Sequence, residues 1–264
     1  SIDPGDRLYI LLRARTALER AKARNAAVVA LQNGLARYPD DPEMMVFAAE
    51  VFWNGDEAER ALAVGYAERV IGVEPSSVRA LGVLLAASLK AADYQAAAGY
   101  ADRILSITKD FGRYGLLFEA YRGAGRTADA ELMAKEWRQR DQSSESAALA
   151  LARILVDKGD RAAAADLLGT LLSGKGSHTY RSTLFWLQSR IQAGEEAILA
   201  SLRSALVENG SNVDALAAMT DYYIKKTDYQ RARFYLKQAM ALDAGRPDIV
   251  ERREVLAQLG VAIP

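Results

Sequence analysis

The chain of 264 residues contains no cysteine and only 6 prolines. The absence of cysteine excludes disulfides and thiolate metal sites. Proline breaks helices, so its scarcity favours a helical fold. The abundance of alanine, with 49 residues, favours the same fold, because alanine has the highest helix propensity.

Neither sign of charge is in excess, since 34 Lys and Arg balance 34 Asp and Glu. A balanced chain lacks the strong positive field on which many nucleic-acid binders depend, so no nucleic-acid partner is predicted. No apolar run reaches the roughly 18 residues of a membrane span, because the longest, 80–89, ends at Lys90. The chain begins Ser-Ile-Asp-Pro, without Met or a signal-like apolar core, and we expect a processed or trimmed piece.

The sequence contains an internal repeat, which is visible as a short turn motif that recurs along the chain. Gly125, Gly159, Ala193 and Thr227 follow one another at intervals of 34 residues, and Ala92 lies 33 residues before the first. An alanine follows four or five positions later in most copies. Apolar columns keep the same step, and they contain Leu117, Leu151, Phe185 and Met219, then Tyr121, Leu155, Ser189 and Tyr223, then Trp137, Leu171, Ala205 and Ala239. Such agreement over four periods indicates a repeat protein.

Each period is predicted to contain two helices. Tyr114, Leu117 and Tyr121 have the three-and-four spacing of one helix face, and Gly125 then interrupts the run. The second helix carries small residues where two helix axes approach closely, namely Ala97, Ala130, Ala164 and Ala232. A hairpin of this length is too small to bury a core alone, so neighbouring repeats must stack on one another.

These residues resemble the tetratricopeptide repeat (TPR) family, whose unit is a helix-turn-helix of about 34 residues. The resemblance covers nearly the whole chain, and its carriers include the Ala92-Asp93-Tyr94 turn, Gly125 with Ala130, and Asp228-Tyr229 with Ala232. The family's closing proline is present at Pro39 and Pro75 and replaced in later copies. The resemblance implies an all-α, right-handed α-solenoid of about seven repeats and a capping helix.

We divide the chain into seven units and a cap within a single solenoid domain, 1–264. The units are 8–41, 42–77, 78–110, 111–144, 145–178, 179–212 and 213–246, and the cap is 247–264. In the cap, Pro247 marks the start of a helix and Gly260 its end. We expect Ile249, Val255, Leu256 and Leu259 to cover the last repeat, and Glu251, Arg252, Arg253 and Glu254 to face water.

Two sequence patterns resemble ligand-binding or catalytic sites, and for both we favour a purely structural role. Residues 169–176 spell most of a phosphate-binding loop, but Gly176 stands where the Mg²⁺-binding hydroxyl should be and no strand precedes the loop. His178 is the only histidine, so a zinc site would need scattered carboxylates. Acidic pairs such as Glu195-Glu196 lie at helix starts and complement the helix dipole there. We therefore predict a non-enzymatic protein without cofactor or metal.

First helices of such repeats line the concave groove, which solenoids use for binding. The resemblance assigns these partner-binding residues to the groove: Phe47, Glu50, Trp53, Arg79, Lys90, Glu119, Arg122, Arg153 and Arg190. Core packing is the alternative role of Phe47 and Trp53, and simple solvation that of the charges. If the arginines bind, they favour an acidic partner segment, because a guanidinium matches a carboxylate in shape and charge.

Charge is uneven along the chain. Residues 40–59 hold seven acids and no base, whereas residues 225–253 hold eight bases and four acids. Weak head-to-tail self-association is therefore one alternative, and solvated surfaces are another.

The predicted function is a protein-protein interaction scaffold that binds a peptide segment or partner helix, in bacterial envelope assembly or secretion. Two alternatives stay open: a self-assembling adaptor that uses its charged ends, and a regulatory or targeting module of a longer protein. The composition fits a bacterial protein of the cytoplasm or of the envelope.

Overall fold

The computed structural model describes residues 6–19, 23–109 and 112–262. These residues form fifteen helices and no strand, and about 80% of them are helical. The predicted all-α fold is therefore confirmed. Its physical basis is the composition, since helix formers outnumber proline and β-branched residues in almost every segment.

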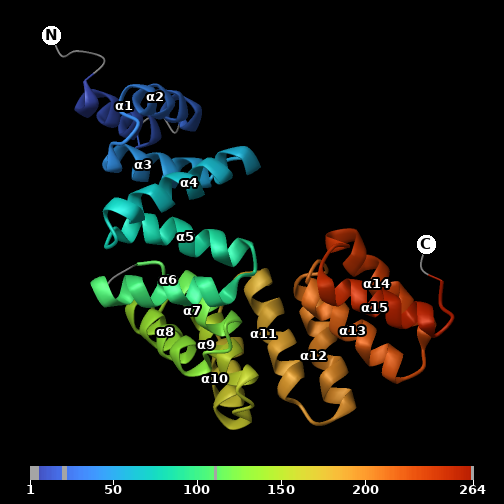
Figure 1. Ribbon diagram of the computed structural model, residues 1–264. Coiled ribbons are helices and arrows are strands. Elements are labelled where there is room, and N and C mark those ends of the chain that lie inside the picture. The colour runs from blue at the N-terminus through green and yellow to red at the C-terminus, as the bar shows by residue number, and fades with distance from the viewer. Residues whose placement is uncertain (1–5, 20–22, 110–111, 263–264) are drawn as a thin grey trace. The chain divides into compact units, whose positions relative to one another are not determined.

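The helices follow one another as seven pairs and a closing helix (Figure 1). The pairs are α1 Arg7–Glu19 and α2 Arg24–Arg37, α3 Pro42–Trp53 and α4 Glu57–Val73, α5 Val78–Lys90 and α6 Tyr94–Ile107, α7 Tyr114–Gly123 and α8 Thr127–Arg140, α9 Glu145–Asp157 and α10 Arg161–Ser173, α11 His178–Ile191 and α12 Glu195–Glu208, and α13 Val213–Lys225 and α14 Tyr229–Asp243. The closing helix is α15 Pro247–Gln258.

The chain forms two compact units, residues 1–133 and 134–264, and the division falls within α8. We describe each unit by itself. The single domain expected from the sequence stays a prediction.

Within each unit the odd-numbered helices contact one another in succession. In unit 1, α3 packs on α5 and α5 on α7; in unit 2, α9 packs on α11, α11 on α13 and α13 on α15. Within the described part of the chain, substantial contacts of the even-numbered helices go only to odd-numbered helices adjacent in sequence. Helices α3, α5 and α7 therefore form one layer in unit 1, and α9, α11, α13 and α15 form one in unit 2, as the first helices of α-solenoid repeats do.

In four of the repeats, the turn between the two helices is built by one left-handed residue. Ala92, Gly125, Gly159 and Thr227 have φ between +56° and +75°. The next residue donates its N–H to a carbonyl five positions back, as Asp93 does to Ser88 over 2.9 Å. This hydrogen-bonded turn around a left-handed residue is a Schellman-type cap. It ends the first helix and sets the direction in which the second begins.

The residue after the left-handed one then begins the second helix. The carboxylates of Asp93, Asp160 and Asp228 each accept the backbone N–H three positions later, over 3.0, 3.2 and 3.1 Å. One dipeptide thus ends one helix and starts the next. Ala193 departs from the other copies, because the chain between α11 and α12 is extended at Gln192 and Gly194.

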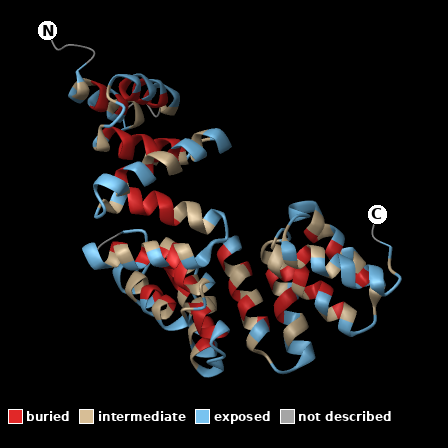
Figure 2. Cartoon of the chain, in the orientation of Figure 1, coloured by how far each residue is buried: buried red, intermediate tan, exposed pale blue. Residues whose placement is uncertain are grey.

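The alanine columns lie in the core. Ala97, Ala130, Ala164 and Ala232 are completely buried, as predicted. Figure 2 shows buried residues along one side of most helices and exposed residues along the loops. Side chains of this size let helix backbones approach closely. The repeat therefore has a small residue at the same contact point of these helix pairs.

The closing helix corrects part of the predicted cap. It starts at Pro247 as predicted, and Gly260 follows its end with φ of +79°. Ile249 and Leu256 are fully buried, but Val255 is 36% exposed and Leu259 44% exposed. The expectation that Val255 and Leu259 cover the last repeat was therefore wrong. The buried side of α15 is too narrow to include all four of the apolar residues.

Candidate functional site

The odd-numbered helices carry ion pairs that join successive repeats. Arg79 on α5 binds the carboxylate of Glu50 on α3, with 3.1 Å between its Nε and Oε1. In unit 2, Arg190 on α11 donates to Asp157 on α9 over 2.9 Å. Farther along, Arg252 on α15 donates to Asp221 on α13 over 2.6 and 2.8 Å. These side chains lie where the layer of odd-numbered helices meets solvent.

We call these surfaces the odd-helix faces and define each within its unit. The unit 1 face consists of Glu50, Arg79, Lys90, Glu119 and Arg122, and the unit 2 face of Arg153, Asp157, Trp186, Arg190, Asp221 and Arg252. Seven of the nine groove residues proposed from sequence carry charge. Six of these seven have a partner within their own unit, namely Glu50, Arg79, Glu119, Arg122, Arg153 and Arg190.

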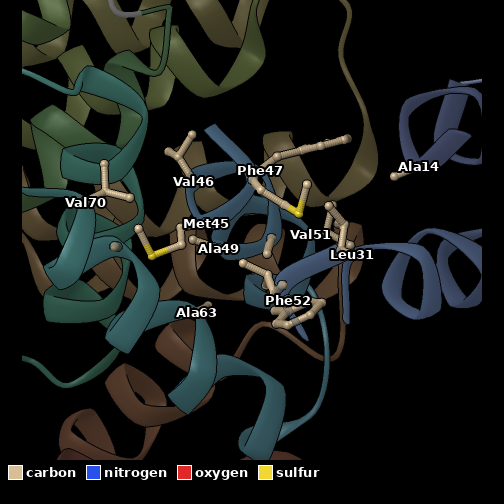
Figure 3. Close-up of a cluster of buried hydrophobic side chains, with 14 of the residues drawn as sticks. Ala14, Leu31, Met45, Val46, Phe47, Ala49, Val51, Phe52, Ala63 and Val70 are labelled. Atoms are coloured by element: carbon tan, nitrogen blue, oxygen red, sulfur yellow. The ribbon is translucent and has the colours of Figure 1, made fainter. Parts of the chain in front are cut away.

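The two predicted groove aromatics lie in or against the core of unit 1. Phe47 is only 8% exposed and belongs to the same cluster of buried apolar side chains as Val51 and Leu31 (Figure 3). Trp53, at the end of α3, is half-buried and packs against the same cluster. Of the two roles left open by the sequence, the structure places Phe47 in core packing, so it is not used in the proposals below.

Glu50 and Arg79 bind each other rather than standing apart. The hydrogen bonds that Arg79 donates to Glu50 raise the pKa of the Arg79 guanidinium above its ordinary value, against the opposing effect of burial. Both side chains stay partly exposed, with 27% for Glu50 and 40% for Arg79. An ion pair of this exposure holds two helices together only weakly and can exchange partners.

The other charges of the unit 1 face have different settings. Glu119 and Arg122 pair along α7, with 2.7 Å between Arg122 Nη2 and Glu119 Oε2. Lys90, the last residue of α5, is exposed to solvent.

The unit 2 face holds a tryptophan that the sequence did not suggest. The guanidinium carbons of Arg153 and Arg190 lie 5.8 and 5.4 Å from the ring centre of Trp186. Trp186 is half-buried and packs against the apolar clusters on both sides of α11. In the sequence, the apolar repeat column contains the neighbouring Phe185 and not Trp186. The only sequence signal for this cluster is that Trp186 and Arg190 are four residues apart and so share one helix face.

A shallow hollow of about 370 Å³ lies between α13 and α15. It is lined by Asp221, Ile224, Lys225, Glu251, Arg252 and Val255. Because Arg252 binds Asp221 and is half-buried, the expectation that it faces water was wrong. The hollow offers a small apolar floor beside charged walls.

The residues that suggested chemistry have structural roles. Residues 169–173 lie in α10, which ends at Ser173, so no strand-loop-helix arrangement exists there. Ser177 caps α11, and its N–H and hydroxyl both donate to Glu145 over 2.6 Å. His178 lies 2.7 Å from Glu208, which also accepts from Arg181.

Ion-pair contacts favour the ionised form of two glutamates, Glu208 and Glu195. Hydrogen bonds from Arg181 first, and from His178 second, lower the pKa of Glu208. Lys226 likewise lowers the pKa of Glu195. Within the described residues no three His, Asp or Glu side chains gather as a metal site, and no helix there could cross a bilayer.

The comparisons with known proteins rest on structure alone. No family model and no curated protein matches the sequence. A tetratricopeptide repeat protein from Parabacteroides merdae superposes with a TM-score of 0.72 at 10% identity, covering 95% of this chain and 98% of that one. The chain has the tetratricopeptide repeat fold.

Other TPR-like neighbours agree at this level. MamA from Desulfovibrio magneticus has a TM-score of 0.55 at 19% identity, over 63% of this chain and 93% of that one. The structure of the APC/C hetero-tetramer Cut9-Hcn1 matches with a TM-score of 0.61 at 13% identity, over 97% of this chain and 50% of that one. At such identities the likeness establishes the TPR fold alone.

Proposed function

We propose that this protein is a non-enzymatic scaffold that binds a peptide segment or a helix of a partner protein on its odd-helix faces. The observation that carries the proposal is the layer of successive odd-numbered helices in each unit, whose surface presents exchangeable ion pairs. The TPR fold supports it, since extended surfaces of this kind are what α-solenoids use for binding. Of the neighbours, the Cut9-Hcn1 structure is by its description a hetero-tetramer.

The absence of enzymatic activity is part of the proposal. It is supported by what the reactive side chains of the described residues do. Ser177, Glu145, His178 and Glu208 all hold helix ends and loops. A site for catalysis needs such groups to converge on a space where a substrate could lie.

The charged ends are less available for self-assembly than the sequence suggests. Five of the seven acids in 40–59 bind arginines of neighbouring helices, namely Asp40, Asp41, Glu43, Glu50 and Glu59. In 225–253, Lys226, Arg231, Arg246 and Arg252 bind acids of unit 2. We therefore place partner binding ahead of the self-assembling adaptor.

The cellular setting, bacterial envelope assembly or secretion, stays a prediction from composition. Fractionation of cells that express the protein from its own gene tests it, since an envelope role requires the protein in the envelope fraction.

Site-specific photo-crosslinking tests the scaffold proposal. A photoreactive amino acid at Lys90 of α5 or Lys225 of α13 places the probe on the layer of odd-numbered helices. The same probe at the exposed Ala165 of α10 or Gln230 of α14 is the matched control. We expect defined crosslinks to a partner from the first two positions only. Equal crosslinking from the control positions would exclude these faces as the binding surface.

A further inference from the structure

The cluster around Trp186 has a chemistry of its own within the unit 2 odd-helix face. Arg153 and Asp157 stand one helical turn apart on α9, and Trp186 and Arg190 stand one turn apart on the neighbouring α11. Both guanidiniums approach the same indole ring, and Asp157 joins the two helices through Arg190. Four side chains from two successive repeats thus form one continuous cluster.

The electrostatics of the cluster select an acidic ligand. Two guanidiniums meet at one ring, and a guanidinium matches a carboxylate in shape and charge. The half-buried indole keeps water from part of each guanidinium and limits the directions that each can adopt. Arginines held in place in this way lose less conformational entropy when they bind a second group.

Arg190 has donors to spare for such a ligand. A guanidinium carries five N–H groups, and Arg190 donates to Asp157 through Nη1. Asp157 is 28% exposed and Arg190 40% exposed, so an incoming carboxylate can reach the pair from solvent. It can bind beside Asp157 or take its place.

The spacing indicates how the ligand presents its acids. Both guanidinium carbons lie within 6 Å of one ring centre. Residues i and i+2 of an extended chain point to the same side and lie roughly 6.6–7 Å apart. The two guanidinium carbons are therefore less than about 12 Å apart, and two carboxylates at that interval can reach both.

We propose that Arg153, Trp186 and Arg190 form a binding site for an extended acidic segment of a partner protein with side-chain carboxylates at alternate residues. The inference rests on the proposed function and names the ligand class of one site within it. It assigns recognition to side-chain carboxylates and not to a chain terminus.

Fluorescence anisotropy with labelled synthetic peptides tests the site on the full chain. The probe is a short Gly- and Ser-rich peptide with Glu-Ser-Glu-Ser-Glu at its centre and both termini blocked. The first control replaces each Glu by Gln. The second control is the Gln peptide with a free C-terminal carboxylate, which separates side-chain recognition from terminus recognition.

Single variants assign the binding to the cluster. We expect Arg153→Gln and Arg190→Gln each to weaken the Glu peptide by about three- to ten-fold, which corresponds to roughly 0.7–1.4 kcal/mol for a partly exposed charge contact. Asp157→Asn should strengthen it, because the competing carboxylate is removed. Arg161→Gln, an exposed arginine on α10 of the same unit, is the matched control and should leave binding unchanged.

The gain from Asp157→Asn separates ligand binding from a structural role, since breaking an ion pair that only held α9 to α11 would not increase affinity. Far-ultraviolet circular dichroism checks that each variant is folded. The proposal is overturned if the Glu peptide does not bind, or if either Gln peptide binds equally well. It is also overturned if Arg161→Gln weakens binding as much as the cluster variants do. Crosslinks from Lys90 or Lys225 together with any of these results would leave the scaffold proposal standing and remove only the acidic ligand.

Discussion

At the scale of single residues, the left-handed turn position shows how a repeat tolerates imperfect copies. Glycine occupies it at Gly125 and Gly159, where the absence of Cβ removes the steric cost. Ala92 and Thr227 adopt the same conformation, with φ of +56° and +57°, although both carry Cβ. The hydrogen bonds that cap the helix, such as Asp228 N–H to Tyr223 over 3.0 Å, hold Thr227 there. A β-branched residue in this region is strained.

We therefore expect Thr227→Gly to stabilise the protein by about 0.5–1 kcal/mol. Among the described residues, the hydroxyl of Thr227 donates a hydrogen bond only to the carbonyl of the preceding Lys226, so little is lost when it is removed. Urea denaturation followed by circular dichroism measures the change. Thr170→Gly, in the exposed middle of α10, is the control and should destabilise the protein slightly because glycine is a poor helix former. A loss of stability in Thr227→Gly would show that its strain is not relieved in this way.

At the scale of helices, the small residues decide how the pairs pack and arginines hold the loops between them. Arg69 on α4 donates to the carbonyl of Pro39 over 2.7 Å, and Arg103 on α6 donates to that of Pro75 over 2.9 Å. These carbonyls lie in the loops that precede α3 and α5. Each loop is thereby tied to the second helix of the repeat that it begins. The sequence showed the proline column but not the arginines that bind it.

Close packing predicts that enlarging Ala164 on α10 disrupts unit 2. Ala164 is completely buried in the cluster with Leu168 and Leu184. Ala164→Phe should therefore cost about 1–3 kcal/mol through overpacking.

The adjacent Ala165 is exposed and provides the matched control. Ala165→Phe should change stability by no more than about 0.5 kcal/mol. Thermal unfolding of both variants measures the difference. Equal melting temperatures would contradict the assignment of Ala164 to the helix interface.

At the scale of the whole molecule, ion pairs between successive repeats recur in both units. Most join residues that are close to one repeat apart in sequence, such as Arg7 with Asp41 and Arg246 with Asp214. In a chain that is neutral overall, many charges are thus paired across the contact between successive repeats. Solenoids depend on such nearest-neighbour interfaces, because no repeat contacts more than its neighbours.

These pairs predict a loss of stability in acid. Hydrogen bonds from Arg246 lower the pKa of Asp248. Burial works to raise the pKa of Asp41, but the hydrogen bonds from Arg7 and from the Met44 N–H outweigh it and lower the pKa. A carboxylate whose folded-state pKa lies below its unfolded value contributes stability above the unfolded value, and that stability is lost as the pH falls through the folded value.

The melting temperature should therefore change little between neutral pH and about pH 5 and should fall below about pH 4, the ordinary range for Asp. Thermal unfolding across this range measures the effect. Asp248→Asn should melt lower than the natural chain at neutral pH and lose less in acid, because one of the titrating groups is absent. A melting temperature that is the same at pH 3 and pH 7 would contradict a stabilising role for the ion pairs.

The sequence by itself determined the all-α repeat fold, the turn positions Ala92, Gly125, Gly159 and Thr227, and the buried alanine column. Each of these depends on local backbone preference or on a period of 34 residues, and both can be read along one chain.

Only the tertiary structure decided which side chains of the odd-helix faces meet. The sequence placed Glu50 and Arg79 on one surface without pairing them, left Phe47 open between a groove position and core packing, and did not mark Trp186. These features depend on the direction of individual side chains and on contacts between helices about 30 residues apart. A repeat period fixes the helix on which a residue lies, whereas the packing of neighbouring helices fixes what its side chain touches.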